Sequence, residues 1–191
     1  MRATYHHGDA RAALVAAGLR LLETTPATEL SLRKVAEAAG LSRQAPYNHF
    51  AGKEGLLASL AQAGFDALAA ALDEAVQEAS GSRAALEALA GAYIRFALAS
   101  PQRFRLMFQC ELVDISRFPE AAAAGRRAFG RISGLVASLA AEDIAADLAV
   151  AAWSLVHGYA TLAIETGFEQ PGDVAARARL FATIISRSAR P

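Results

Sequence analysis

The chain has 191 residues, a formal net charge of zero at pH 7 and 54% hydrophobic residues. A chain of this length holds one small and one medium domain with an ample core. Because its net charge is zero, the composition of the whole chain does not by itself indicate a nucleic-acid-binding protein. The single cysteine, Cys110, excludes an intrachain disulfide and is typical of a reducing cytosol. Because no apolar segment typical of a secretory signal follows the first residues, we expect a cytoplasmic protein.

The charges are distributed unevenly along the chain. Residues 1–55 have seven Lys or Arg against five Asp or Glu, whereas the remainder has twelve against fourteen. Three of the four histidines also lie in the first part. The asymmetry is small, but it has the sign expected of a nucleic-acid-binding head on a neutral body.

The first 50 residues predict three helices joined by tight turns. The first spans residues 9–24, with Asp9 as its N-cap and an apolar stripe that includes Leu14 and Gly18. After a connection containing Pro26, a short helix is expected over residues 31–39, capped by Ser31 and ended by Gly40. Ser42 is suited to cap another helix over residues 42–49. Two short helices joined by so tight a turn form a helix-turn-helix.

The second helix of this pair offers side chains suited to DNA. Arg43, Gln44, Tyr47, Asn48 and His49 supply hydrogen-bonding groups for base edges and phosphates. Lys53 and Glu54 then open the next helix, whose free N–H groups are suited to hold a phosphate. A generic helical hairpin with a polar outer face is the alternative, because serine caps and glycine stops are common.

The complete register decides between these interpretations. Over residues 30–54 the sequence LSLRKVAEAAGLSRQAPYNHFAGKE closely resembles the DNA-binding segment of the tetracycline-repressor (TetR) family of bacterial transcriptional regulators. The resemblance covers about the first 60 residues. It implies base contacts from Arg43, Gln44 and Ala45, and phosphate contacts from Tyr47, His49 and Lys53, with Asn48 suited to either. The other predicted DNA-binding residues are Ser31, Arg33 and Ser42.

Pro46 departs from the aliphatic residue that many TetR relatives have at this position. As the fourth residue after Ser42, it removes at most one early hydrogen bond and can pack on Leu41. A proline here resembles one TetR subgroup, so DNA binding is still expected, although a borrowed base-by-base code is not.

The rest of the chain also predicts only helices. A long helix over residues 53–79 is expected to span head and body, with Leu57, Leu60, Leu68 and Leu72 on its buried stripe. The next helix is expected to end near residue 100. Four more helices are expected over residues 101–108, 119–140, 142–166 and 173–187. No segment alternates like a strand. The prediction is an all-α fold of about nine helices, with a DNA-binding head over residues 1–55 and a ligand-binding and dimerisation body over residues 56–191.

The uncharged segment over residues 148–164 is slightly short for a bilayer and contains polar residues such as His157, so we interpret it as a buried helix and not as a membrane span. The last two helices each have apolar residues on two faces. A body of this size does not easily cover both helices, which favours a second copy and a four-helix bundle between subunits. The predicted dimer-interface residues are Leu155, Tyr159, Leu162, Phe181, Ile184 and Ile185.

Trp153, His157 and Gly158 follow the spacing W-x-x-x-H-G, which resembles a C-terminal signature of the same TetR subgroup. The family resemblance implies a small-molecule effector that releases a repressor from its operator. The candidate ligand-binding residues are Tyr93, Phe104, Met107, Phe108, Trp153 and His157. The alternative is a packed core, because an aromatic stripe at helical spacing is usually core and a buried histidine is usually hydrogen-bonded to a neighbouring helix.

Ser154, His157 and Glu165 share a helix and raise the alternative of an enzyme. A nucleophile in the middle of a helix lacks the free backbone N–H groups that hold an oxyanion. The sequence has no glycine-rich phosphate loop or nucleophile elbow, and the adjacent His6 and His7 give poor metal geometry. We therefore predict no catalytic site, metal or cofactor.

A helical dimer that acts only as an interaction adaptor would account for the body but not for the head. The prediction is a cytoplasmic, homodimeric transcriptional regulator of the TetR type, most simply a repressor. Its expected partners are a pseudo-palindromic double-stranded operator, a second copy of the chain and an unidentified small molecule, with no membrane.

Overall fold

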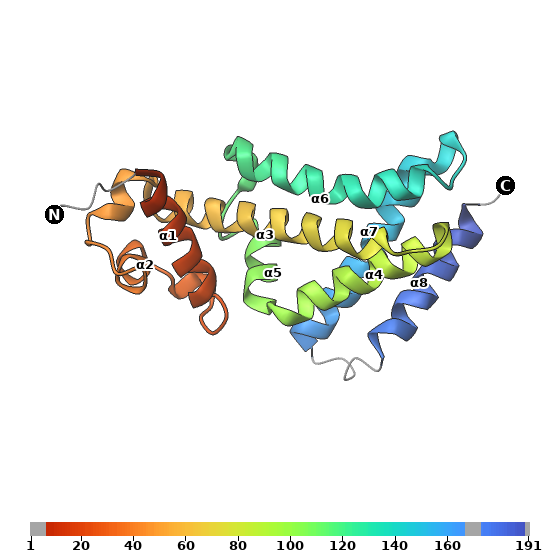
Figure 1. Ribbon diagram of the computed structural model, residues 1–191, viewed down its shortest axis with the longest axis horizontal. Helices are drawn as coiled ribbons and strands as arrows, with labels where there is room; N and C mark the ends of the chain where they lie inside the picture. Colours follow the sequence, from red (N-terminus) through yellow and green to blue (C-terminus); the bar gives the residue numbers. More distant parts are fainter. Residues whose placement is uncertain (1–6, 167–172, 190–191) are drawn as a thin grey trace. The chain divides into compact units, whose positions relative to one another are not determined.

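The computed structural model describes residues 7–166 and 173–189, and within them it has eight α-helices, three 3-10 helices and no strand (Figure 1). The all-α prediction is confirmed, and His6 lies outside the described residues. The elements in chain order are α1 (His7–Leu21), η1 (Ala27–Glu29), α2 (Leu32–Ala38), η2 (Ala45–Asn48), α3 (Gly52–Gln77), α4 (Ser82–Ala99), α5 (Pro101–Phe108), η3 (Ile115–Arg117), α6 (Pro119–Ala137), α7 (Glu142–Thr166) and α8 (Val174–Ser188).

The predicted helix boundaries agree with the structure to within a few residues, with two corrections. Helix α1 begins before Asp9, so that residue lies inside the helix and is not its N-cap. The segment expected as a helix over residues 42–49 is instead the four-residue η2. Boundaries shift because helix ends depend on single hydrogen bonds that apolar periodicity does not encode.

The chain divides by its contacts into two compact units. Unit 1 is Met1–Gly64 with Ser100–Ala124, and unit 2 is Phe65–Ala99 with Gly125–Pro191. Helices α3 and α6 therefore contribute residues to both units. This is a division by packing, whereas the predicted boundary at residue 55 is a division by function.

In unit 1, helix α1 packs against α2 and η2, and it also meets α3 at Gly18 and Leu60. Leu14 and Leu60 are completely buried, and so is Val35 of α2. At Gly18 an added Cβ atom would lie 2.8 Å from Leu60 Cδ2, so a larger residue here would force the Leu60 side chain to shift where α1 meets α3. Helix α5 packs against η1 in the same unit. Together these contacts hold the helix-turn-helix segment on an apolar base.

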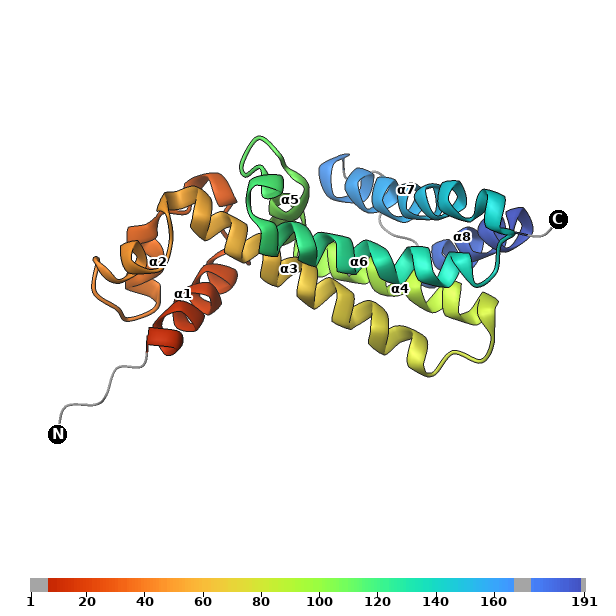
Figure 2. The ribbon, with the colours of Figure 1, turned by 90° about the horizontal axis from the view of Figure 1, so that it is seen from above.

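Unit 2 is a helical layer in which α4 packs against both α7 and α8, and α7 packs against α8 (Figure 2). Tyr93 and Ile94 of α4 are completely buried at its centre. Two arginines of α6 form exposed ion pairs with α3: Arg127 lies 2.6 Å from Asp66, and Arg131 contacts both carboxylate oxygens of Asp73 at 2.7 and 2.8 Å. Exposed pairs of this kind add at most about 1 kcal/mol each.

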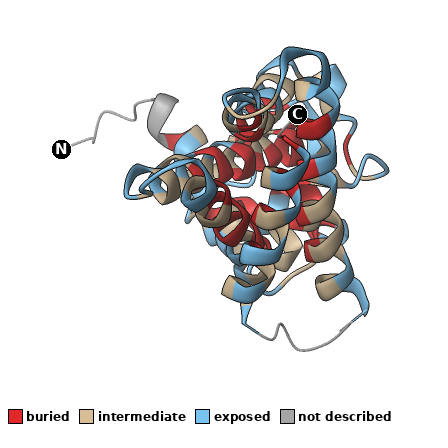
Figure 3. Cartoon of the chain, turned by 90° about the vertical axis from the view of Figure 1, so that its right-hand side faces the viewer, coloured by how far each residue is buried: buried red, intermediate tan, exposed pale blue. Residues whose placement is uncertain are grey.

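Two helices, α3 and α7, are long and apolar enough to cross a membrane by length and composition alone. In α3, 56% of the apolar window is buried within the chain, whereas in α7 only 22% is buried. Figure 3 shows buried residues on the inward faces of the helices and exposed residues on their outer turns. Much of the apolar surface of α7 therefore remains uncovered within one chain, and the interpretation of residues 148–164 as a buried helix stays a prediction that depends on a second copy.

Candidate nucleic-acid interface

The turn after α2 has the geometry that its sequence predicts. Ser31 is extended, and its Oγ accepts a hydrogen bond from the backbone N–H of Lys34 at 3.2 Å. At the other end Gly40 has a φ of 68°, and the N–H of Leu41 donates to the carbonyl of Ala36 at 2.9 Å. This pattern is the Schellman motif, in which glycine takes a left-handed conformation at low energy. The predicted N-cap at Ser31 and the predicted stop at Gly40 of helix α2 are both confirmed.

The second helix of the pair differs from the prediction. Its backbone hydrogen bonds join residues three apart, as in the N–H of Tyr47 donating to the carbonyl of Gln44 at 3.2 Å. A bond between residues four apart forms at its end, from the N–H of Phe50 to the carbonyl of Pro46 at 2.9 Å. Gln44 takes the N-cap position, so Ser42 is not the cap that we expected. Pro46 explains the difference, because it has no N–H for a bond to Ser42 and disfavours α geometry in the residue before it.

The side chains of η2 and its flanks sort cleanly by exposure. Pro46 is buried and packs η2 against the rest of unit 1, whereas the side chain of Tyr47 is 57% exposed. Ser31, Ala45 and His49 are half-buried. The other predicted DNA-binding side chains are exposed: Arg33, Ser42, Arg43, Gln44, Asn48 and Lys53. A short, rigid segment thus presents polar and aromatic side chains outward from a buried proline.

Two lysines are oriented by the backbone of η1. Lys53 Nζ donates to the carbonyl of Thr28 at 2.6 Å, and Lys34 Nζ donates to the adjacent carbonyl of Glu29 at 3.0 Å. Because each ammonium has three N–H donors, both retain donors for a phosphate. Sequence reasoning did not include Lys34, although its position beside Arg33 on a short capped helix was a usable signal.

Known proteins match both the head and the body of this chain. Residues 14–60 match the family model described as "Bacterial regulatory proteins, tetR family", and residues 86–186 match the model "Tetracyclin repressor-like, C-terminal domain". A solved structure of a protein of unknown function from Rhodococcus sp. RHA1 is 34% identical, with a TM-score of 0.82, over 99% of this chain and 100% of that one. The chain belongs to the TetR family of bacterial transcriptional regulators. It is therefore a DNA-binding regulator, as its head geometry indicates.

More distant TetR structures share the fold. A bacterial regulatory protein in the TetR family from Rhodococcus RHA1 is 18% identical, with a TM-score of 0.66, over 94% of this chain and 96% of that chain. The TetR family transcriptional regulator PfmR from Thermus thermophilus is 22% identical, with a TM-score of 0.63, over 94% and 98%. No protein with a curated description matches the chain significantly.

In unit 2 of this TetR protein, three of the predicted ligand-binding residues meet in one polar network. Trp153 Nε1–H donates to the hydroxyl of Tyr93 at 3.2 Å, and that hydroxyl lies 2.9 Å from Nδ1 of His157. Burial raises the pKa of Tyr93 well above its usual value, so its hydroxyl keeps its proton. Tryptophan only donates, so the Tyr93 hydroxyl accepts from Trp153 and is also hydrogen-bonded to Nδ1 of His157. One ring nitrogen of His157 is thus used in joining α4 to α7.

The other three predicted ligand-binding residues lie in unit 1. Phe104 and Met107 are buried, and the rings of Phe104 and Phe108 lie 4.9 Å apart. An added Cβ at Gly64 would lie 2.7 Å from Met107 Sδ, so α3 and α5 approach closely here. The contact units therefore separate the six candidates into two sets of three. Periodicity places residues on helix faces but does not determine which helices those faces meet.

A small apolar cavity lies among α4, α6, α7 and α8 of the TetR regulator. It holds about 20 Å³ and is lined by residues that include Leu89, Val156 and Phe181. Small-molecule sites are typically about 300–1,000 Å³. An effector that enters this part of unit 2 therefore requires the helices to open.

The predicted dimer-interface residues lie on α7 and α8. Leu162 and Ile184 are 51% and 41% exposed, and Leu155, Tyr159 and Phe181 are half-buried. The rings of Tyr159 and Phe181 meet edge to face at 5.9 Å. Ile185 is a correction, because it is only 4% exposed and lines the small cavity inside unit 2. On the exposed face of α8, the apolar residue that the prediction did not include is Leu180, which is 47% exposed.

The stability of the TetR protein is expected to fall as the pH drops below about 6.5. Burial lowers the pKa of His157 below its usual value of 6.5, so at mildly acidic pH the unfolded chain binds a proton that the folded chain does not. The free energy of unfolding therefore decreases between about pH 6.5 and the folded pKa. Urea unfolding of wild type and His157→Asn across this range measures the effect. An equal slope in the two proteins would contradict it.

Proposed function

We propose that this TetR protein is a homodimeric repressor that binds a two-fold related operator and is released by a small molecule. Residues 1–55 read DNA, and residues 56–191 provide dimerisation and effector binding. The observation that carries the DNA-binding part is the set of exposed side chains on η2 and on the turn before it, which a buried proline and a Schellman turn hold in place. Rigid presentation lowers the conformational entropy lost on binding.

Base reading and backbone positioning fall to different side chains in this proposal. Arg43 and Gln44 are exposed on the turn that opens η2 and are suited to pair with base edges in the major groove. Tyr47, Lys53 and Lys34 are suited to phosphates, which orient the protein without specifying sequence. His49 and Asn48 flank the same surface. Ser31 contributes chiefly by capping α2, because its Oγ already accepts a backbone N–H.

Removing Lys53 is expected to weaken binding to all duplexes about equally. Lys53→Ala removes one phosphate contact and should flatten the slope of log affinity against log salt by about one unit. Gln44→Ala should instead lower affinity for the best site by about 1–3 kcal/mol and blur its sequence preference. Fluorescence anisotropy with specific and random duplexes at several salt concentrations measures both effects.

Arg126→Ala is the matched control for charge, because Arg126 is also exposed but lies on α6 in unit 2. It should change neither the slope nor the preference. The division of roles would be wrong if Lys53→Ala and Gln44→Ala weakened specific and random duplexes to the same extent.

Dimerisation is supported by the uncovered apolar surface of the last two helices. Val150 and Leu162 on α7 are more than half exposed, and Leu180 and Ile184 on α8 are nearly so. At Gly158 an added Cβ would meet no atom within 4 Å, so α7 also offers a smooth point for close helix approach. A second copy placing α7 and α8 against these helices would form a four-helix bundle and cover the surface. The same cover accounts for the membrane-like composition of α7 in a cytoplasmic protein.

The effector is proposed to act through the Tyr93–Trp153–His157 network of unit 2. This network joins α4 to α7, and the ring of Phe129 on α6 packs on Trp153 at 5.3 Å. A ligand that opens these helices changes the free energy of one conformation relative to another, which is how it alters DNA binding at a distance. A difference of about 1–3 kcal/mol would weaken operator binding some 5- to 150-fold.

A screen of small aromatic compounds is expected to find one that quenches Trp153, the single tryptophan, and lowers operator affinity. Trp153→Phe, which keeps a ring but loses the N–H, should blunt the response to that compound more than it reduces DNA binding. The effector assignment fails if no compound quenches Trp153 and Trp153→Phe alters only stability.

A further inference from the structure

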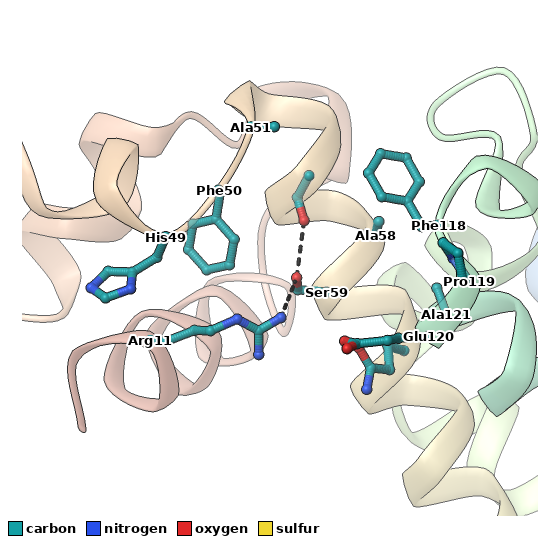
Figure 4. Close-up of a pocket in the computed structure, with 12 residues that line it drawn as sticks. Arg11, His49, Phe50, Ala51, Ala58, Ser59, Phe118, Pro119, Glu120 and Ala121 are labelled. Carbon is teal, nitrogen blue, oxygen red and sulfur yellow. Dashed lines mark hydrogen bonds between the residues drawn. The ribbon is translucent and has the colours of Figure 1, made fainter. Parts of the chain in front are cut away.

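A second, larger cleft lies in unit 1, and one of its lining residues, His49, is also a proposed DNA contact. It opens between α1, the start of α3 and the start of α6, and its volume is about 410 Å³ (Figure 4). That volume lies within the range of small-molecule sites, about 300–1,000 Å³. Its walls include the rings of Phe50 and Phe118 and the methyl groups of Ala51 and Ala58. The cleft is therefore mainly apolar and has aromatic side chains on two sides.

One wall of the cleft holds a guanidinium in a fixed orientation. Arg11 Nη2 donates to Ser59 Oγ at 3.1 Å, and Ser59 Oγ donates in turn to the carbonyl of Gly55 at 3.0 Å. The guanidinium carbon also lies 5.7 Å from the centre of the Phe50 ring. These contacts use one of the five N–H donors of arginine and leave the rest for an anion. A guanidinium held in this way is preorganised to bind a carboxylate.

The opposite wall holds a carboxylate. Glu120 lies in the first turn of α6, and Figure 4 shows its side chain directed across the cleft toward Arg11. Arg11 and Glu120 do not form an ion pair within the described part of the chain, so the space between them separates two opposite charges. An ion pair joins the segment just before α6 to α3, with Arg117 Nη1 2.8 Å from Glu54 Oε1. This pair fixes the start of α6, which carries Glu120, relative to α3.

We propose that this cleft binds a small aromatic carboxylate with a hydrogen-bond donor at the end opposite its acid group. The carboxylate pairs with Arg11, the ring lies between Phe50 and Phe118, and the donor reaches Glu120. Glu120 repels a second acid group, and Arg11 repels a ligand that has only a cation. This site is distinct from the effector network of unit 2, and its calorimetric test requires no DNA.

Isothermal titration calorimetry of the full chain with para-hydroxyphenylacetate tests the proposal. This probe has a carboxylate, one ring and a phenol donor. Saturable binding at one site per chain is expected. Phenylacetate, which lacks the donor, and tyramine, which lacks the carboxylate, should each bind at least about tenfold more weakly.

Substitutions at the two poles should have different effects. Arg11→Gln is expected to lower affinity for both acids by at least about tenfold, and Arg11→Lys should restore part of it. Glu120→Ala removes the acceptor for the phenol and should remove the preference for para-hydroxyphenylacetate over phenylacetate. Ala51→Trp changes no charge and should block the cleft, while Arg126→Gln on α6 should leave binding unchanged. Circular dichroism of each variant establishes that it is folded.

The proposal is overturned if none of the three compounds binds the wild type, or if Arg11→Gln and Ala51→Trp both bind like the wild type. It is also overturned if no acid binds and Arg11→Gln instead weakens duplex binding, because Arg11 would then be a phosphate contact. Failure of operator binding in the wild type would leave these calorimetric outcomes unaffected, so the two proposals are tested separately.

Discussion

Replacing Ile184 with glutamate is expected to convert the protein to monomers and to lower its operator affinity by about 10²–10⁴-fold. Ile184 is exposed on α8 within one chain, and in the proposed bundle it is covered by the second copy. A carboxylate buried there without a partner costs far more than the apolar contact that it replaces. Loss of the dimer removes the second recognition segment, which should lie about 34 Å away, one turn of the duplex.

Analytical ultracentrifugation at micromolar concentration and anisotropy with a full operator measure the two effects. Leu162→Glu on α7 should give the same result, because Leu162 is also half exposed. Ala70→Glu is the matched control, since it adds the same charge at an exposed position of α3. A wild-type protein that sediments as a monomer, or an Ile184→Glu protein that remains dimeric, would disprove the proposed interface.

Replacing Tyr93 with alanine is expected to destabilise the protein by at least about 3–5 kcal/mol, the range for truncating a large aromatic residue in a core. Tyr93 is completely buried, so truncation leaves a cavity. It also leaves the N–H of Trp153 without the acceptor that it has at 3.2 Å. Small domains have a total stability of about 5–15 kcal/mol, so this loss is a large fraction of the whole.

Tyr93→Phe separates the two contributions, because it retains the ring and removes only the hydroxyl. It should cost about 1–3 kcal/mol, the penalty for buried polar groups left unpaired. Tyr47→Phe is the matched control, since the ring of Tyr47 is 57% exposed, and it should change stability by less than about 0.5 kcal/mol. Urea unfolding at one protein concentration provides the comparison. Equal stability of Tyr93→Phe and wild type would show that the buried network is not stabilising.

Part of the site was readable from the sequence because it depends on local interactions. The cap at Ser31 and the left-handed stop at Gly40 each involve residues within five positions of one another, and both form as predicted. The resemblance to the TetR family rested on this same local register, and the comparisons bear it out. The 3-10 geometry of η2 also follows from a local cause, the missing N–H of Pro46, whose effect the prediction underestimated.

Other features depended on which helices meet, and periodicity does not contain that information. Ile184 and Ile185 are adjacent and equally apolar, yet one is 41% exposed and the other 4%. Both faces of α7 and α8 are apolar, so the pattern predicted excess surface without showing which face the chain itself covers. The cleft beside Arg11 is a further example, since its walls come from residues more than 100 positions apart. The sequence by itself determined an all-helical regulator with a helix-turn-helix head, because caps, turns and periodicity act over a few residues. Only the tertiary structure decided which apolar and charged side chains face one another, because that choice depends on packing between distant segments.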